Sequence, residues 1–478
     1  MHAASRVGAI ARHMASATPP PPPPEEPKVL FEENLSLRRF ILNRDKKMNA
    51  LDGGMLESIG KKVEHWNKSD LAGVIVGSGK GRAFCAGGDV ADVVLKATSE
   101  ETRQEAIDYF RLEFGVDYTL ACLRKPYVAV MDGLTFGGGA GLAAPALFRV
   151  ATEKTALSMP ETKIGYFPDV GASYFLSRLD GEIGTYLALT GEPLSGRATF
   201  EHGFATHFIS SHRVPILLER LAALEDPTLA QIDSVIEELY FEREPADPVA
   251  PLMGAIRVAL DSAFSHNSVE GIIKALEDLA AGSNADVIPW AKNTLASLNK
   301  VSPTSLRVAL LAIRKAKTMN LLDVLKMEAS IAAAFCSGAT PDFQTGVTTV
   351  IVKKIRDERP AWSPATLSEV NAEEIEAKFF KNAPQTSLVL PEELQEEHAI
   401  PSHFTRFALP TEEEIGKVVK GEHPTSDGEA LTAEEVVAKF EGLRRGKHGV
   451  SAKVREVLAR RCVAEGKGEE AQYLRWKH

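Results

Sequence analysis

Apolar positions along the first 160 residues follow two periods, and each period predicts one kind of element. Leu51, Met55, Ile59 and Val63 recur every four residues and predict a helix over 51–66, and a second helix is expected over roughly 101–123. Short alternating or continuous apolar runs predict strands, several of them buried, at 29–31, 35–42, 71–76, 127–131, 148–151 and 156–159. Strands that alternate with helices predict an α/β fold.

The pattern changes beyond residue 214. Residues 215–336 have mainly the helical period, in Ala- and Leu-rich stretches such as 217–224 and 306–313. Ser302 followed by Pro303 is typical of a helix start. Residues 384–401 have the composition of a linker, and short helices are expected at 410–419 and 430–440.

The last 35 residues are rich in basic side chains. Two interpretations are open for this run: a solvated helix face, or a tail that docks on RNA or protein. The basic residues are Arg444, Arg445, Lys447, Lys453, Arg455, Arg460, Arg461, Lys467, Arg475 and Lys477.

Composition narrows the functional classes. The 478 residues contain 55 Lys and Arg against 65 Asp and Glu, a formal net charge of −10, which argues against a DNA-binding or general nucleic-acid coat protein. The four cysteines lie far apart, so a disulfide scaffold is excluded and no metal site is expected. No apolar run approaches the ~20 residues of a membrane helix, so no membrane contact is expected.

The N-terminus is basic and free of acids. Residues 1–24 contain Arg6 and Arg12 but no Asp or Glu, which predicts a mitochondrial transit peptide, with a plain disordered tail as the alternative. The six prolines Pro19–Pro24 predict a stiff polyproline II spacer. The expected location is therefore the mitochondrial matrix.

Two glycine clusters carry the first candidate chemistry. Residues 84–89 read FCAGGD, residues 136–141 read FGGGAG, and each cluster precedes an expected helix. Two backbone N–H groups that converge there would form an oxyanion hole. A phosphate loop is the rival, but neither cluster has the GxxxxGK[ST] lysine. Tight turns that allow close packing are the structural alternative.

A Pro- and Gly-rich loop at 159–171 carries the second candidate chemistry. Its two carboxylates, Glu161 and Asp169, lie eight residues apart. A carboxylate held against an oxyanion hole could serve as base or nucleophile on an acyl group. The alternative is that Asp169 caps the helix beginning near Gly171 and that Glu161 is a solvated surface acid.

The order of these motifs resembles the crotonase (enoyl-CoA hydratase/isomerase) superfamily and, within it, the 3-hydroxyisobutyryl-CoA hydrolases. The resemblance covers about residues 28–383 and rests on AFCAGGD, KPYVAVMDGLTFGGGAGL, FRVATEK, MPETKIGYFPDVGASYFL, LALTGEPLSGR, GFATHFI, SPTSL and PDFQTGV. It implies a spiral of ββα units over 28–213 and a helical region over 214–383 that covers the active site. The transit peptide and spacer (1–27) and a C-terminal extension (384–478) lie outside it.

The resemblance also assigns roles. It implies hydrolysis of 3-hydroxyisobutyryl-CoA in valine catabolism, with no cofactor apart from the CoA of the substrate. Glu161 would attack the thioester or activate water, and the two routes stay open. The other implied site residues are the backbone N–H groups of Gly88 and Gly138, the substrate-contacting acids Glu113 and Asp169, and Ala86 and Asp89 beside the CoA.

One position separates hydrolysis from hydration. Hydratases of the superfamily carry a second glutamate at the position of Gly141, so its absence favours thioester hydrolysis over the less favoured enoyl-CoA hydratase reading. Thr345 and Thr348 stand where the family usually has Glu and Arg. His207 and Cys85 are expected to be packing residues.

A second role is also implied. Fungal members of this group are associated with the small subunit of the mitochondrial ribosome, and the extension 384–478 would be the docking element. Subunit contacts through the helical region, and hence an oligomer, are a further possibility that the resemblance implies.

Overall fold

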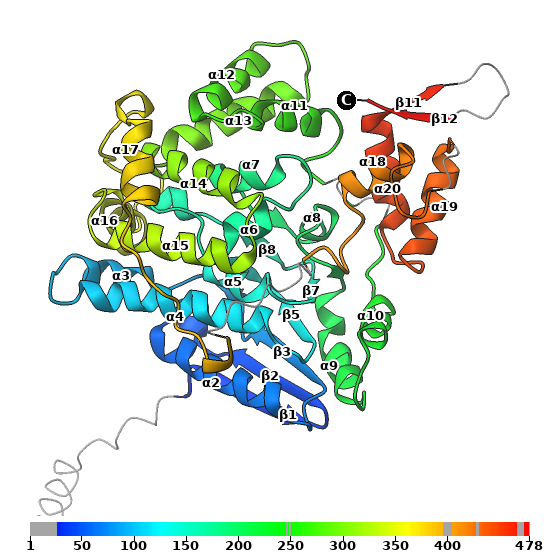
Figure 1. Ribbon diagram of the computed structural model, residues 1–478, viewed down its shortest axis with the longest axis horizontal. Helices are drawn as coiled ribbons and strands as arrows, with labels where there is room; N and C mark the ends of the chain where they lie inside the picture. The colour runs from blue at the N-terminus through cyan, green and yellow to red at the C-terminus, as the bar shows by residue number, and fades with distance from the viewer. Residues whose placement is uncertain are drawn as a thin grey trace, which may run out of the picture.

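The computed structural model describes residues 26–244, 247, 250–394, 404–426, 430–465 and 473–477. The predicted transit peptide and the proline run lie outside these residues. The structure contains a large and a small sheet, and the large one runs from the lower edge of the molecule (β1, β2) toward its centre (β5, β7) in Figure 1. The larger has the order β1-β2-β3-β5-β7-β10, with bounds Val29–Asn34, Leu37–Leu42, Val74–Gly79, Tyr127–Met131, Phe148–Ala151 and His207–Phe208.

Along the chain, strands of the smaller sheet alternate with strands of the larger sheet. Its order is β4-β6-β8-β9, with bounds Ala83–Cys85, Leu134–Phe136, Ala156–Ser158 and Leu194–Ser195. The chain therefore passes from a strand of the large sheet to a strand of the small one and then to a helix, in β3-β4-α3 and again in β5-β6-α5. Strands β2, β3, β5, β7 and β10 run parallel, as do β4, β6 and β8.

Alternation along the large-sheet strands assigns their two faces. Val74, Val76, Val128 and Val130 belong to one apolar cluster with residues of α9 (Val214–Ala222) and α10 (Leu229–Glu237). Their neighbours along the strands belong to the main core, together with residues of α2 (Gly53–Lys68) and α4 (Arg103–Ala121). Because successive side chains of a strand point to opposite faces, the apolar runs are buried on both sides.

Most predicted elements of the spiral are confirmed, with shifts at two strand starts. Leu35 lies in the turn before β2 with a φ of 50°, so the strand expected at 35–42 begins at Leu37. The run at 71–76 was expected to end at the glycines, yet β3 starts at Val74 and includes Gly77. Leu71 is exposed, whereas a Cβ at position 77 would lie 2.5 Å from Cζ of Phe40. Gly77 belongs to the strand because it pairs with Phe40 of β2 and Ala129 of β5, and the Phe40 ring leaves no room for a side chain there. The helix that contains Gly141 ends at Ala143, before Pro145, as its missing N–H requires.

Helices dominate the rest of the chain, as the period predicted. Ser302 caps α14, where its side chain accepts a hydrogen bond from the backbone N–H of Ser305. No helix of the described residues is long and apolar enough to cross a membrane. The remaining helices up to residue 383 are α3 (Val90–Ala97), α5 (Gly138–Ala143), α6 (Ala172–Leu176), α7 (Ile183–Thr190), α8 (Arg197–Glu201), α11 (Gly254–Phe264), α12 (Val269–Ala280), α13 (Val287–Lys300), α14 (Pro303–Ala316), α15 (Leu321–Cys336), α16 (Asp342–Gly346) and α17 (Ala372–Glu376).

The C-terminal segment forms a small helical unit beside the spiral, at the upper right of Figure 1. The two expected helices are present and a third follows. The elements are α18 (Glu412–Val419), α19 (Ala433–Leu443), α20 (Val450–Arg461) and the hairpin of β11 (Cys462–Glu465) with β12 (Tyr473–Trp476).

Candidate active site

The two glycine clusters meet at one edge of the small sheet. They follow β4 and β6, which are parallel neighbours, so their carboxyl ends place both loops side by side. A Cβ at position 87 would lie 3.7 Å from the backbone nitrogen of Gly138. The backbone N–H groups of Gly88 and Gly138 donate to no backbone acceptor among the described residues. Two such free donors on adjacent loops are the requirement for an oxyanion hole.

Two carboxylates press on the second glycine loop. A Cβ at position 138 would lie 2.4 Å from Oε1 of Glu113, which projects from α4. A Cβ at position 137 would lie 2.6 Å from Oε1 of Glu161, and Gly137 has a φ of 47°. The positive φ favours glycine at position 137, and a side chain at position 138 would displace the carboxylate of Glu113. The structure therefore brings together Glu113, Glu161 and the loop of Gly138, which are distant in sequence.

The loop 159–171 is anchored deeply enough to fix its acids. Glu161 opens the 3-10 turn η2 (Glu161–Ile164), and Thr162 Oγ1 donates to the carbonyl of Leu189. The side chain of Tyr166 stacks on Phe343 of α16, with ring centroids 4.5 Å apart. The carboxyls of Glu161 and Asp169 are consequently buried, and the interpretation of Glu161 as a solvated surface acid is wrong.

Strained backbone follows Asp169. Val170 has a φ of 55°, which costs energy for a β-branched residue and is typical of functional sites. The side chain of Asp169 does not cap α6, contrary to the structural alternative. Glu328 of α15 does so instead, because its oxygens accept from the backbone N–H groups of Gly171 at 2.6 Å and Ser173 at 2.9 Å. That long-range cap holds the loop end in place.

The buried acids share one electrostatic environment without an ion pair to any described Lys or Arg. Burial, with the charge of Glu113 and then Glu328 added, raises the pKa of Glu161 to about 8. Burial alone raises the pKa of Glu113 to about 8 and that of Glu328 to about 7. Burial, and then Glu113 and Glu161, raise the pKa of Asp169 well above its usual range. The raised pKa values favour the neutral form of these carboxyls, and a protonated carboxyl can donate a hydrogen bond.

Sequence analysis missed two members of this group. Asp117 is buried one helical turn after Glu113, and neither of its oxygens has a hydrogen-bond partner among the described residues. Burial, and then Glu113 and Glu328, raise its pKa. The four-residue spacing puts both acids on one face of α4 and could have revealed Asp117. Glu328 lies 157 residues from Gly171, so no local pattern announces it.

Position 141 has no room for a side chain. A Cβ there would lie 2.6 Å from Cβ of Val170 and 2.9 Å from Oδ2 of Asp117. A glutamate at this position would therefore clash, and the local packing agrees with the glycine in the sequence.

Ala86 and Asp89 lie on the outer side of the first glycine loop. The backbone N–H of Ala86 donates to the carbonyl of Met48, and Asp89 pairs with Arg44 at 2.9 Å. The exposed Lys46 and Lys47 of η1 (Asp45–Lys47) lie on the same loop as Arg44. Arg44 and Lys47 also lie near Asp52 and Asp89, so basic and acidic side chains are mixed beside the glycine loop.

The residues expected to be inert lie as expected. The Cys85 thiol is buried, and burial raises its pKa, which disfavours a thiolate nucleophile. His207 is buried in β10 and contacts Asp233 and Lys447, not the group of acids around Glu161. Thr345 of α16 and Thr348 of the following π-helix η4 (Val347–Val352) are half-buried, in a segment that packs on η2.

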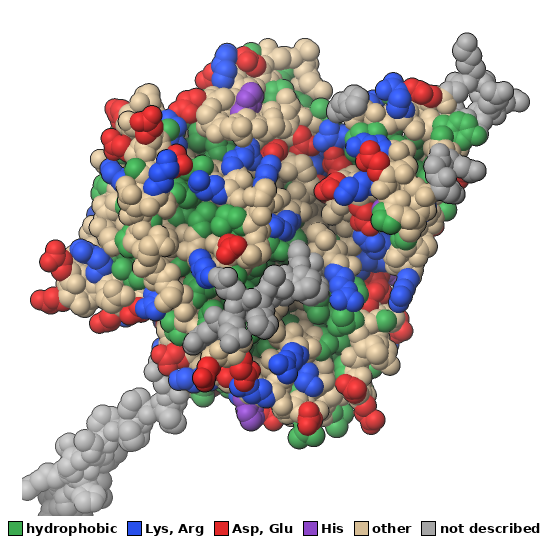
Figure 2. All heavy atoms as spheres, in the orientation of Figure 1, with side chains coloured by type: hydrophobic (Ala, Val, Ile, Leu, Met, Phe, Trp, Pro, Cys, Tyr) green, Lys and Arg blue, Asp and Glu red, His purple; other side chains and the backbone are tan. Residues whose placement is uncertain are grey.

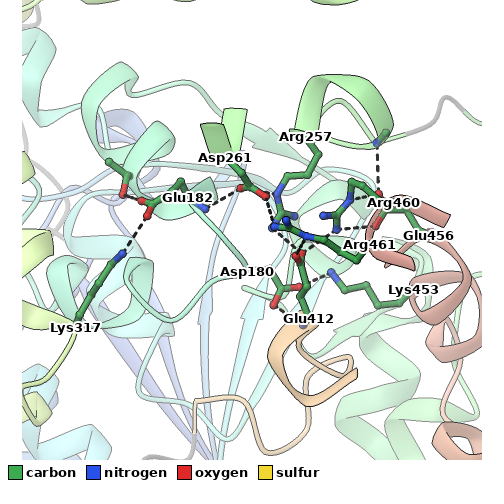
Figure 3. Close-up of polar contacts among 12 residues, drawn as sticks. Asp180, Glu182, Arg257, Asp261, Lys317, Glu412, Lys453, Glu456, Arg460 and Arg461 are labelled. Carbon is green, nitrogen blue, oxygen red and sulfur yellow. Dashed lines mark hydrogen bonds and ion pairs between the residues drawn. The ribbon is translucent and has the colours of Figure 1, made fainter. Parts of the chain in front are cut away.

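The basic run after Arg444 is mostly paired within the chain. Lys453 pairs with Asp180 at 2.6 Å, and Arg460 pairs with Glu412 at 2.8 Å (Figure 3). The side chains of Lys453 and Arg460 are at most 7% exposed, so the interpretation as a solvated helix face is wrong for these two residues. Basic and acidic side chains are interspersed over this unit in Figure 2. Further pairs are Arg444–Glu414, Lys447–Glu237, Arg455–Glu434, Arg461–Asp261 and Arg475–Glu465.

Comparison with known proteins gives one consistent family. The enoyl-CoA hydratase/isomerase family matches residues 37–380. The chain is 38% identical over 464 residues to the small ribosomal subunit protein mS47 of Neurospora crassa, covering 95% of this chain and 88% of that protein. It is 40% identical over 339 residues to the mitochondrial 3-hydroxyisobutyryl-CoA hydrolase of Gallus gallus, covering 71% and 85%. A crystal structure of a carnitinyl-CoA dehydratase from Mycobacterium thermoresistibile matches with a TM-score of 0.66 at 30% identity, covering 76% and 98%.

Proposed function

Because the chain belongs to the enoyl-CoA hydratase/isomerase (crotonase) family, we propose that it hydrolyses 3-hydroxyisobutyryl-CoA to 3-hydroxyisobutyrate and CoA. The observation that carries the proposal is the buried Glu161 carboxyl against the Gly137–Gly138 loop, opposite the free N–H of Gly88. Similarity to 3-hydroxyisobutyryl-CoA hydrolases at about 40% identity supports this substrate.

The thioester carbonyl oxygen would rest between the N–H groups of Gly88 and Gly138. Both donors stabilise the negative charge that develops on this oxygen when the carbonyl carbon is attacked, and each is worth about 10²–10³ in rate. Because the donors are backbone groups on fixed loops, they need no reorganisation during the reaction.

Glu161 could promote hydrolysis of the thioester in two ways. As a base, it takes a proton from water, the water oxygen bonds to the carbonyl carbon, the C–S bond breaks, and the proton passes to the CoA sulfur. As a nucleophile, its carboxylate displaces the CoA thiolate and forms a mixed anhydride, which water then opens. Both routes require the ionised form of Glu161, and both remain open.

The protonated acids around Glu161 fit a hydroxylated acyl group. Glu113 and Asp169 are buried with raised pKa values, and a protonated carboxyl can donate to, or accept from, the substrate hydroxyl. Oε1 of Glu113 has no partner among the described residues. A hydroxyl that satisfied it would bind better than a methyl group, because a buried unpaired polar atom is costly.

Hydrolysis fits the site better than hydration does. Addition of water across a double bond would use a second carboxylate at position 141, and Val170 and Asp117 occupy that space. The CoA moiety would lie along the outer loop of Ala86 and Asp89. There, the exposed Lys46 and Lys47 could contact the CoA phosphates, on a chain whose net charge is −10.

A test of Glu161 compares variants of the full-length protein. CoA release from 3-hydroxyisobutyryl-CoA is followed with a thiol reagent for the wild type, Glu161→Gln, and Glu219→Gln as the matched exposed control in α9. We expect Glu161→Gln to lose about 10²–10⁴ in kcat, the range of a general base, and the control to match the wild type. Equal activity of Glu161→Gln and the wild type would remove Glu161 from the mechanism.

The C-terminal extension supports a second role, and we propose that the protein also associates with the small subunit of the mitochondrial ribosome. The mS47 relative aligns with 95% of this chain, whereas the hydrolase relative aligns with 71%. Co-sedimentation of the full-length protein with mitochondrial small subunits tests this role. Migration with free proteins alone at low salt would refute it.

The division of the chain and its location are proposed with the same function. We propose that residues 1–27 direct the protein to the mitochondrial matrix, that 28–213 and 214–383 form the catalytic body, and that 384–478 is the extension. The hydrolase relatives are mitochondrial by name. A transit peptide is removed on import, so we expect mass spectrometry of protein from purified mitochondria to find an N-terminus near the proline run, and an intact Met1 would contradict this role.

A further inference from the structure

Three potential metal ligands surround one point where the edge of the large sheet meets α10. His207 is at the start of β10, while Asp233 and Glu237 lie one turn apart on α10. Nε2 of His207 lies 2.9 Å from Oδ1 of Asp233 and 3.2 Å from Oε1 of Glu237. All three ligand atoms lie within 4.8 Å of one another. The sequence did not reveal this group, because its members come from separate elements.

A cation of the protein itself already lies in this group. The Lys447 ammonium comes from the loop between α19 and α20, next to α10 in Figure 1. It lies 3.0 Å from Nε2 of His207 and 2.5 Å from Oε1 of Glu237, and its side chain is 4% exposed. The C-terminal segment therefore reaches the sheet edge through a positive charge held at the centre of a ligand set.

The contacts of the two ring nitrogens are compatible with a lone pair at Nε2. The hydroxyl of Thr206 accepts from the backbone N–H of Arg149 and lies 3.1 Å from the carbonyl of Arg149, to which it can donate. When it does, Nδ1 of His207, 2.8 Å from this hydroxyl, is the donor, and Nε2 accepts from the Lys447 ammonium at 3.0 Å. In the neutral ring Nε2 then carries a lone pair. A fixed outer hydrogen bond of this kind is typical of metal-ligating histidines.

The lone pair faces an acceptor. Oδ1 of Asp233 lies 2.9 Å from Nε2, and two acceptors at this separation repel each other unless a positive charge lies between them. Lys447 supplies one such charge. Three ligands around a tetrahedral ion at about 2.0 Å would lie about 3.3 Å apart, close to the two separations found at His207.

We propose that His207 Nε2, Asp233 and Glu237 form a site for one divalent ion of the zinc class, and that the Lys447 ammonium fills this site while its loop is docked. The ligand set of one imidazole and two carboxylates suits Zn²⁺ or Co²⁺. Binding of the ion excludes Lys447, so the ion and the docked loop compete.

The other groups at the site fit this competition. His448 Nδ1 lies 2.8 Å from the second oxygen of Glu237, and its ring stacks on Tyr240 with centroids 4.3 Å apart. These contacts belong to the same loop as Lys447. Displacement of Lys447 would therefore loosen the whole turn 444–449 from α10.

The test uses Co²⁺ as the probe, since its visible absorption reports nitrogen and oxygen ligands. The full-length Lys447→Met variant is titrated beside the wild type and beside Lys447→Met/Asp233→Asn, which lacks one ligand at a half-buried position. We expect the single variant to bind one ion, and the double variant to bind at least about tenfold more weakly. Equal affinity of the two variants would overturn the site.

A second measurement avoids any folding defect of Lys447→Met. Amide hydrogen exchange at 444–449 is compared in the wild type with and without excess Zn²⁺, with Asp233→Asn as the matched control. We expect Zn²⁺ to accelerate exchange in the wild type and not in the control. Unchanged exchange in the wild type would contradict competition between Zn²⁺ and Lys447.

Discussion

We predict that replacement of Glu161 by Gln raises the unfolding free energy, and that this gain grows as the pH rises from about 4.5 to about 8. Burial and the neighbouring charges of Glu113 and Glu328 raise the pKa of Glu161 from 4.5 to about 8. A carboxyl whose pKa is raised on folding supports the folded state below its unfolded pKa. That support is lost as the pH rises through the folded value. The unfolding free energy of the wild type should therefore fall between about pH 4.5 and pH 8.

The size of this effect follows from the two pKa values. Each pKa unit corresponds to 1.36 kcal/mol, so between about pH 5.5 and pH 8 the group costs the wild type on the order of 3 kcal/mol. Gln carries no charge, so its titration does not lower the unfolding free energy of the variant over this pH interval. For a chain of this size, 1 kcal/mol corresponds to roughly 1 °C in Tm, so the variant should gain about 3 °C on the wild type across the interval.

The assay is urea unfolding and thermal melting at about pH 5.5 and at about pH 8. Glu161→Gln is measured beside the wild type and beside Glu219→Gln, an exposed control. We expect the difference between Glu161→Gln and the wild type to grow with pH and the difference for the control to stay constant. A difference that shrinks or stays constant as the pH rises would refute the assignment of a high pKa to this carboxyl.

Three further predictions concern the site and the extension. The kcat/KM for thioester hydrolysis should rise with pH and level off above about pH 8, because Glu161 must be ionised; a profile that falls over pH 6–8 would contradict this. Gly138→Ala places a methyl group against Glu113 and should lower kcat/KM by about 10² or more, whereas Gly442→Ala, with open space around it, should not. Glu412→Gln leaves Arg257, Arg460 and Arg461 without their shared counter-charge and should lower the unfolding free energy in urea by about 3–5 kcal/mol. The exposed neighbour Glu413→Gln should lower it by only about 0–1 kcal/mol. Equal losses would show that the buried network is not needed.

The local pattern predicted those parts of the fold that local physics determines. The strand 127–131 was predicted at its observed bounds, because a continuous apolar run buried on two faces leaves few alternatives. The three-residue strands β4 and β6 were not predicted, although β8 of the same length was, since runs this short give no reliable period. They nonetheless decide the site, because their pairing aligns the two glycine loops.

The same division applies to the candidate site. Glycine clusters and a Pro-rich acidic loop are local signals, and they led to the clusters at 84–89 and 136–141, Glu161 and Asp169; the resemblance to the crotonase superfamily then singled out Gly88 and Gly138. Glu328 and the inward-facing Lys447 depend on contacts between residues more than 150 positions apart. A basic residue in a helical tail has the same local pattern whether it meets water or a buried carboxylate. Only the packed structure distinguishes the two.

The most direct test of the proposed chemistry compares hydrolysis of a thioester with hydration of a double bond by the same protein. The full-length protein is incubated in parallel with 3-hydroxyisobutyryl-CoA and with crotonyl-CoA, and free CoA and hydroxyacyl-CoA are both quantified by mass spectrometry. We predict release of CoA from 3-hydroxyisobutyryl-CoA and little hydroxyacyl-CoA from crotonyl-CoA. Hydration of crotonyl-CoA without cleavage of either thioester would contradict the proposed function.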